Sequence, residues 1–268
     1  DFSENAKRDQ KDFLIIGHRG GGRMSDGVPH SENTIELAMV AEELGANAIE
    51  VDVRKSADGV VYLYHDATIN PRLVRKNTLV GATEDYTWNV LRSEITLTHG
   101  EKIPKLGDFL RAVVDRTKAV FVYLDTKTSG DGILKDMADT VKLVNEYAAS
   151  VGRSELKIYL GIPNTELLDE LKELRTKPGY ENVESLIETS YDDAVNNGAT
   201  VWSPRWSDGT QQSSVNAFTS VPGKVAVTWT INMPVYIQEY LAVPRANRFT
   251  GFLTDYPMIV KYYILMQL

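Results

Sequence analysis

Histidines, an arginine and two carboxylates stand at the ends of three short apolar runs in this chain. His18 and Arg19 follow the first run, and His65 ends the third. Glu50 and Asp52 close the second run. Because α/β folds gather their chemistry at the carboxyl ends of strands, these residue types predict a site that combines an acid–base group, a cation and paired acids.

The two carboxylates have the spacing of a metal site. Glu50 and Asp52 are two residues apart, so in a strand they share one face while the neighbouring valines point to the other. Like charges on one buried face repel each other unless a cation lies between them, and Mg²⁺ and Ca²⁺ prefer carboxylate oxygens. A solvated edge strand with alternating charges is the alternative, because so short a motif is common.

A turn signal links the second and third apolar runs. They are joined by Asp58-Gly59, which favours a two-residue hairpin turn. In that register Asp52 faces His65 across an antiparallel pair, with Cβ atoms about 5 Å apart. The hairpin would return a histidine to the level of the carboxylates, which argues against the solvated-edge alternative.

The histidines differ in their sequence context. His18 and His65 both fall at predicted strand ends, where the ordinary imidazole pKa of about 6.5 suits acid–base catalysis. Lone histidines are more often structural, and His30 and His99 lie in loop-like stretches. We predict that only His18 and His65 are catalytic.

Further candidates have a functional and a structural interpretation. Arg19 precedes three glycines, so it could fork onto phosphate oxygens while the glycines permit close approach, or the glycines could serve only a tight turn. Asp125 and Lys127 end a later strand. They could bind a ligand at the catalytic end of the barrel, or they could form only a salt bridge at the strand terminus. Trp229 ends another strand. Its side chain could pack in the core, or it could form an aromatic wall for a ligand.

Apolar runs rich in β-branched residues alternate with amphipathic stretches. The predicted strands are residues 13–17, 48–53, 60–65, 119–125, 156–160, 183–187, 199–202, 225–229 and 250–253. The predicted helices are residues 33–44, 133–149, 164–174, 208–218, 234–241 and 257–268, with Ser31 or Asn33 as the first N-cap. This alternation predicts an α/β fold, a (β/α)8 TIM barrel; no G-x-G-x-x-G supports the rival doubly wound sheet.

Two irregularities refine the barrel. Nine strands are predicted, one more than an eight-stranded barrel needs. We predict that the extra strand, residues 60–65, pairs antiparallel with the strand before it at the rim of the barrel. Residues 67–104 are largely polar with a weak helical signal near Trp88, which indicates a small inserted subdomain over the catalytic face. We expect one domain over residues 1–268.

Composition narrows the classes of partner. The 268 residues are 43% hydrophobic, enough for one large core, and the net charge of -8 argues against non-specific binding of nucleic acid. The absence of cysteine excludes disulfides and thiolate metal sites, and no apolar run predicts stable membrane insertion. The polar residues 1–11 predict a loose arm. The Met-less start has two interpretations, a removed leader or trimming of the sequence. A removed leader favours a periplasmic or secreted location, and a cytoplasmic location stays open.

In chain order, these residues resemble the motifs of the glycerophosphodiester phosphodiesterase family. The matching segments are His18-Arg19-Gly20, Glu32-Asn33-Thr34, Glu50-Val51-Asp52, Asp58-Gly59 with His65-Asp66, Asp125-Thr126-Lys127, Trp229-Thr230-Ile231-Asn232 and Thr254-Asp255-Tyr256-Pro257. Each segment alone is weak evidence for the family, but the whole set in this order is highly specific for it. The resemblance spans the chain from the first strand to the last helix.

The resemblance implies a phosphoric diester hydrolase of lipid metabolism on a (β/α)8 barrel, which cleaves small glycerophosphodiesters to sn-glycerol 3-phosphate and an alcohol. It implies one divalent metal, Mg²⁺ or Ca²⁺. The implied site has the metal at Glu50, Asp52 and Asp125, the acid–base pair His18 and His65, and Arg19 and Lys127 on the phosphate.

Some positions depart from the family pattern. Asp125 stands where the family usually has glutamate, Ser31 replaces a proline, and Asn70-Pro71-Arg72 only loosely matches an arginine-threonine stretch. These departures concern the substrate and the metal more than the reaction. The sequence leaves open which alcohol leaves, which histidine is the acid, and the oligomeric state.

Two other functions stay open. One is a phospholipase of the same superfamily that acts on whole lipids, which would need an apolar or basic rim that residues 67–104 do not clearly show. The other is a barrel that binds phosphate esters or a glycan without turnover. A pure binder needs no acid–base pair, so the two histidines argue against it.

Overall fold

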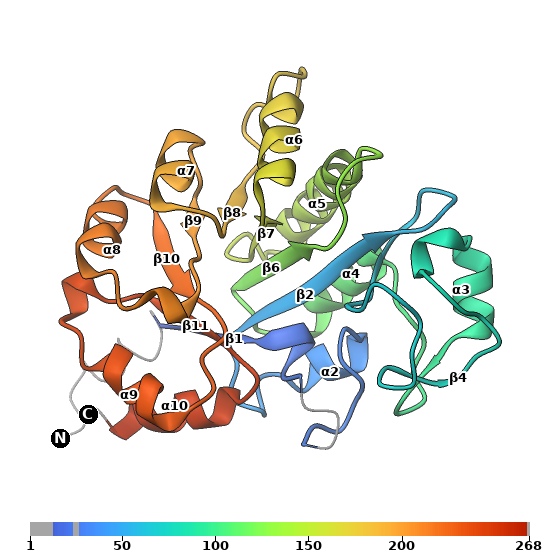
Figure 1. Ribbon diagram of the computed structural model, residues 1–268, viewed down its shortest axis with the longest axis horizontal. Helices are drawn as coiled ribbons and strands as arrows, with labels where there is room; N and C mark the ends of the chain where they lie inside the picture. Colours follow the sequence, from blue (N-terminus) through green and yellow to red (C-terminus); the bar gives the residue numbers. More distant parts are fainter. Residues whose placement is uncertain (1–12, 24–26, 267–268) are drawn as a thin grey trace.

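The computed structural model describes residues 13–23 and 27–266, so the predicted N-terminal arm lies outside the described residues. Within them, eight parallel strands form a closed barrel surrounded by helices (Figure 1). The barrel strands are β1 (Leu14–Gly17), β2 (Ala48–Lys55), β6 (Phe121–Thr126), β7 (Lys157–Ile162), β8 (Ser185–Ile187), β9 (Val201–Trp202), β10 (Val225–Thr228) and β11 (Gly251–Thr254). The predicted TIM barrel is confirmed.

The barrel closes where the first strand meets both the last and the second. Ile16 of β1 pairs with Leu253 of β11 on one side and with Ala48 of β2 on the other. These three side chains are buried in the barrel interior, together with Tyr123 and Tyr159. The alternate residues of the strands point outward, where they form the larger core beneath the helices.

Each helix around the barrel buries one apolar stripe. These helices are α2 (Ile35–Met39), α4 (Leu106–Arg116), α5 (Ile133–Ser150), α6 (Thr165–Arg175), α7 (Tyr191–Asn196), α8 (Gln212–Thr219), α9 (Pro234–Leu241) and α10 (Pro257–Met266). The six predicted helices are present, whereas α4 and α7 are additional. In α4 the residues Leu106, Phe109, Leu110 and Val113 are fully buried at the spacing of one helical face.

The predicted hairpin exists, but its register is wrong by one residue. β3 (Val61–Leu63) pairs antiparallel with β2, and Tyr64 rather than His65 lies opposite Asp52, since the Tyr64 amide donates to the Asp52 carbonyl at 3.1 Å. Gly59 has φ of 85°, so the turn is a three-residue loop closed between Ser56 and Val60 instead of a two-residue turn. The added loop residue shifts every cross-strand partner.

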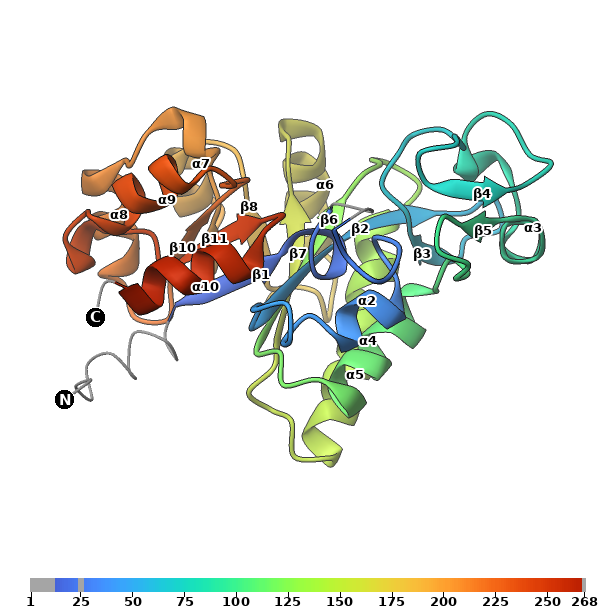
Figure 2. The same ribbon diagram turned by 90° about the horizontal axis from the view of Figure 1, so that it is seen from below.

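The insertion after the hairpin forms a small unit beside the barrel, at the right of Figures 1 and 2. It contains β4 (Val74–Lys76), α3 (Trp88–Glu94) and β5 (Thr96–Leu97), and β4 pairs with β5. Trp88 and Leu91 of α3 pack on Tyr62 and Tyr64 from the hairpin, so the unit has its own apolar cluster. The predicted weak helix is therefore real, and the two short strands were not predicted.

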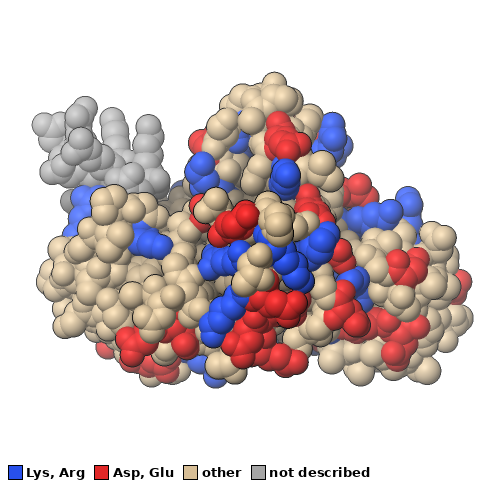
Figure 3. Space-filling view, turned by 90° about the horizontal axis from the view of Figure 1, so that it is seen from above, with Lys and Arg blue, Asp and Glu red and all other residues tan. Residues whose placement is uncertain are grey.

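The surface mixes both signs of charge. On the face shown in Figure 3, Lys and Arg side chains gather near the centre with Asp and Glu side chains close around them. Although the net charge of the protein is negative, this face does not carry charge of one sign only. Among the described residues, no helix combines the length and the apolar character that a bilayer crossing requires.

Candidate active site

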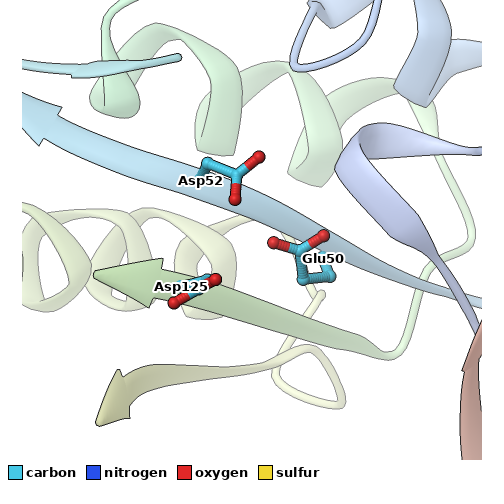
Figure 4. Close-up of side chains that lie close together, drawn as sticks. All are labelled: Glu50, Asp52 and Asp125. Atoms are coloured by element: carbon cyan, nitrogen blue, oxygen red, sulfur yellow. The ribbon is translucent and has the colours of Figure 1, made fainter. Parts of the chain in front are cut away.

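Three carboxylates converge at the carboxyl ends of two neighbouring strands. In the parallel pairing of β2 with β6, Glu50 lies beside Tyr123 and Asp52 beside Asp125. Oxygen atoms of Glu50, Asp52 and Asp125 all lie within 4.8 Å of one another (Figure 4). The E-x-D alternation puts two acids on the inner face of β2, and strand register adds the third from β6.

This concentration of acids is held together by cations and carries a strong electrostatic cost. Burial, followed by the charges of Asp52 and Asp125, raises the pKa of Glu50 well above its ordinary value. Burial also disfavours the charged form of Asp52, but Lys127, His65 and Arg19 overcome it and lower the pKa of Asp52 to about 2. Lys127 lies 2.9 Å from Asp52 and also contacts Asp125.

The acidic cluster has the donor set of a divalent-cation site. Oε1 of Glu50 and Oδ1 of Asp125 are buried and have no hydrogen-bond partner among the described residues. Buried carboxylate oxygens without partners are costly unless a cation binds them. Three converging carboxylates are the hard oxygen ligands that Mg²⁺ and Ca²⁺ take, so these residues fit such a metal.

Asn33 fixes the orientation of Asp52. Its Nδ2 donates to Oδ2 of Asp52 at 2.7 Å, and its Oδ1 accepts from the Asp52 amide at 2.9 Å. Asn33 and Ser31 were predicted as alternative N-caps of the first helix, and both predictions are wrong. Thr34 is the N-cap, with its hydroxyl accepting from the Leu37 amide. Asn33 has instead a left-handed φ of 59°, which turns its amide toward β2.

The turn after β1 places His18 and Arg19 beside the acids. The Gly22 amide donates to the His18 carbonyl at 2.8 Å, and a Cβ on Gly17 would come within 2.8 Å of Gly21. The glycines therefore serve a tight turn. Arg19 has φ of 54° within this turn, and its amide donates to Oε2 of Glu50 at 2.7 Å.

His18 is oriented by residues from the other end of the chain. Its Nδ1 lies 2.6 Å from Oδ1 of Asp255, and Nδ2 of Asn232 donates to the other Asp255 oxygen at 2.6 Å. Despite burial, the hydrogen bond and the charge of His18, with Asn232, lower the pKa of Asp255. With Nδ1 engaged, Nε2 of His18 is left on the side of Glu50, 3.8 Å from Oε2.

His65 has an equivalent partner in its neighbour. Its Nδ1 lies 2.6 Å from Oδ1 of Asp66, and Arg72 donates to both Asp66 oxygens, at 2.6 and 3.0 Å. Arg72 also contacts both oxygens of Glu32, which accepts from Arg19 at 2.8 Å. A continuous chain of charged side chains therefore connects the His65 ring to Arg19.

A cavity of ≈ 450 Å³ lies over this cluster. Its volume falls within the range of about 300–1,000 Å³ that is typical of sites for small ligands. All eight candidate residues except Asp52 line it, and Asp52 is fully buried beneath. Trp229 forms part of the wall, with its Nε1 donating to the Ser203 carbonyl. His30 and His99 are not among the lining residues, and His30 contacts Glu101 instead, consistent with structural roles.

Several residues of the site were not given roles from the sequence. Glu32, Asn33, Asp66, Asn232 and Asp255 stand in the quoted motifs, so their positions in those motifs are the signal that could have identified them. Two others had no such signal. Glu188 and Arg205 line the cavity from the loops after β8 and β9.

Known proteins resemble this chain in sequence and in fold. The model of the glycerophosphoryl diester phosphodiesterase family matches residues 18–258. A glycerophosphodiester phosphodiesterase of Caldanaerobacter subterraneus is 34% identical over 38% of this chain and 41% of its own length. The glycerophosphocholine phosphodiesterase GDE1 of Candida albicans is 41% identical over 20% of this chain and 5% of its own length. The matched segments thus span less than half of each of these curated relatives.

Solved structures agree over nearly the whole chain. A glycerophosphodiester phosphodiesterase from Parabacteroides distasonis superposes with a TM-score of 0.71 at 20% identity, covering 96% of this chain and 98% of that one. A phosphodiesterase from Oleispira antarctica, in complex with the product sn-glycerol-3-phosphate, gives 0.66 at 17% identity, covering 97% and 99%. These likenesses establish the fold, and the family model covers the motifs. The chain belongs to the glycerophosphoryl diester phosphodiesterase family.

Proposed function

We propose that this protein hydrolyses glycerophosphodiesters to sn-glycerol 3-phosphate and an alcohol, in a reaction that requires a divalent metal and the acid–base pair His18 and His65. The observation that carries the proposal is one cavity containing two histidines, each with Nδ1 engaged by an aspartate, next to three converging carboxylates. Family membership supports the same chemistry, and so does the product bound to the Oleispira antarctica relative.

The carboxylates Glu50, Asp52 and Asp125 would hold one Mg²⁺ or Ca²⁺. When bound, such an ion supplies Lewis-acid stabilisation of the charge on the phosphate oxygens. Arg19 and Lys127 line the same cavity and add fixed positive charge next to the phosphate. The neighbouring acids hold Lys127 charged, because they raise its pKa in spite of its burial.

Proton transfer falls to the two histidines. An imidazole whose Nδ1 is bonded to a carboxylate is fixed in orientation and presents Nε2 for proton transfer. One histidine removes the proton of the attacking hydroxyl, and the other protonates the oxygen of the departing alcohol. In the proposed reaction the attacker is the substrate's own glycerol hydroxyl, and water then opens the resulting cyclic phosphate. This agrees with the absence of cysteine from the sequence, and with the finding that no serine among residues 13–23 and 27–266 pairs with either histidine.

Release of glycerol 3-phosphate from glycerophosphocholine tests the proposal. Metal-stripped protein should be inactive, and Mg²⁺ or Ca²⁺ should restore turnover that EDTA removes again. A folded protein that binds glycerophosphocholine but releases no glycerol 3-phosphate with either ion would support the phosphate-ester binder instead. Equal turnover with EDTA would contradict the metal requirement alone.

A further inference from the structure

The side of the cavity away from the histidines carries polar groups that the proposed phosphate chemistry does not use. In the barrel order, β8 lies four strands from β1 in both directions, so Glu188 at its end faces His18 across the mouth. Arg205 follows β9 and Trp229 follows β10, and both line the same cavity. These three residues form the distal wall.

The side chains of Glu188 and Arg205 have no hydrogen-bond or ion-pair partner within the described part of the chain. Glu188 is half-buried, and no hydrogen bond or ion pair joins its carboxyl group to another described residue. Arg205 is close enough to act on Glu188 electrostatically but forms no ion pair with it. Its guanidinium lies 4.9 Å from the centroid of the Trp229 ring. A carboxyl and a guanidinium that share a cavity wall without pairing leave room for a group that bonds to both.

The charges of the distal wall disfavour ions of either sign. A quaternary ammonium group would need a free aromatic face, but Arg205 already occupies a face of Trp229 and would repel it. A second anionic group would face Glu188 and the acidic cluster. A hydroxyl group avoids both penalties, because it can donate to the carboxyl and accept from the guanidinium.

The protonation of Glu188 points the same way. Burial, with a smaller contribution from Asp52, raises the pKa of Glu188 to about 8 against the opposing effect of Arg205. This shift favours the neutral carboxyl, which has one O–H donor and one carbonyl acceptor. That pair complements adjacent hydroxyl groups better than it complements a cation.

The leaving alcohol is the part of the substrate that would meet this wall. In the proposed reaction one histidine serves the attacking glycerol hydroxyl and the other serves the leaving oxygen, which departs from the opposite side of the phosphorus. The part of the alcohol beyond that oxygen would therefore extend away from the glycerol moiety and across the cavity. We propose that Glu188 and Arg205 form the subsite for the leaving alcohol and select a polyhydroxyl alcohol over a quaternary ammonium one. The proposal rests on the proposed function.

The test compares glycerophosphoinositol with glycerophosphocholine through the ratio of their kcat/KM values. Loss of one hydrogen-bonding partner in Glu188→Ala should lower this ratio about tenfold. Glu188→Gln keeps a donor and an acceptor of similar shape and should recover most of the ratio. Arg205→Met should lower it as well, which provides a second variant if Glu188→Ala folds poorly. Glu146→Ala, an exposed glutamate on α5, is the matched control.

The possible outcomes separate the subsite from the function itself. An unchanged ratio in both Glu188→Ala and Arg205→Met would overturn the subsite, and so would a ratio that rises because glycerophosphocholine loses more. An equal loss on both substrates would mean that the wall holds the glycerol moiety, which also overturns the proposal. A wild-type protein that cleaves neither diester would contradict the proposed function before the subsite is tested.

Discussion

Nδ1 of His18 lies 2.6 Å from Oδ1 of Asp255, although the two residues are separated by 237 positions in the chain. His18 follows β1 and Asp255 follows β11, and these strands are neighbours with Gly17 paired to Thr254. Closure of the barrel therefore creates the contact. The orientation of a candidate catalytic histidine depends on the last strand of the fold.

Asp255→Asn should reduce turnover without preventing metal binding. The amide keeps the size of the side chain but removes the charge that favours a protonated ring during the reaction, so kcat should fall about a hundredfold. Steady-state kinetics on glycerophosphocholine, with calorimetry of the metal, measures both effects. Asp192→Asn, at an exposed position in the first turn of α7, is the control. Wild-type kcat in Asp255→Asn would mean that His18 needs no orienting carboxylate.

His18 and His65 should behave as one catalytic unit. Each alanine variant should lose about a hundredfold or more in turnover, because each removes one of the two proton transfers. The double variant should be much less than multiplicatively worse, as for groups that act together. His30→Ala, outside the cavity lining, should retain activity. A single variant with near wild-type turnover would remove that histidine from the mechanism.

Glu50→Gln should stabilise the metal-free protein while weakening metal binding. Burial and the neighbouring acids raise the pKa of Glu50, so the folded protein binds this proton more tightly than the unfolded chain does. The charged form thus opposes folding at neutral pH, and the penalty disappears as the pH falls toward the ordinary glutamate pKa of 4.5. Thermal unfolding in EDTA should show a higher Tm for Glu50→Gln, by an amount that shrinks toward that pH.

Calorimetry completes the test of the metal site. Wild-type protein should bind Mg²⁺ or Ca²⁺ near one equivalent, and both Glu50→Gln and the double variant Glu50→Ala, Asp52→Ala should bind far more weakly. Glu146→Gln should match the wild type in Tm and in binding. Unaltered binding in the double variant would place the metal elsewhere.

Arg72 should stabilise the protein in a pH-dependent way through Asp66. Burial opposes ionisation of Asp66, but hydrogen bonds from Arg72, His65 and Asn70 outweigh it and hold its pKa far below the usual range. The folded protein therefore binds this proton less tightly than the unfolded chain, whose aspartate pKa is about 3.9. The stabilisation is complete above that value and is lost as the pH falls further.

Denaturant unfolding of wild type and Arg72→Met at several pH values checks this sign. The difference in unfolding free energy should be constant above about pH 5 and should shrink below about pH 4. It should be modest, because the Arg72 side chain is 40% exposed. Lys118→Met, which removes an exposed pair with Glu42, should show no such dependence. A difference that persists undiminished to pH 2 would exclude Asp66 as the partner that matters.

A substrate that lacks the attacking hydroxyl should turn over far more slowly. Proximity of the glycerol hydroxyl to the phosphorus contributes several kcal/mol, about 7 or more in well-oriented systems. The measurement needs a matched pair of glycerophosphodiesters that share one leaving alcohol and differ only at that hydroxyl. Equal rates at saturation would mean that water attacks directly, and one histidine would then activate water.

The motif residues and the strand order could be predicted from the sequence, because both depend on local patterns. Apolar runs with helical stretches between them indicate parallel strands, and parallel strands bring their carboxyl ends to one face. Glu50 and Asp52 share a face through simple alternation, and Asp125 follows its own strand. The barrel follows from these rules and is confirmed. Seven of the eight candidate residues line one cavity and Asp52 lies beneath it, while their roles stay predictions.

The partners of those residues were decided by the tertiary structure. A single left-handed residue, Gly59, shifted the hairpin register, so Tyr64 took the place predicted for His65. The Asp255 contact with His18 requires barrel closure, and the bridge from Asp66 through Arg72 to Glu32 requires the insertion to dock. Such contacts join segments far apart in the chain, and their energies depend on distances of a few ångströms that no local periodicity encodes.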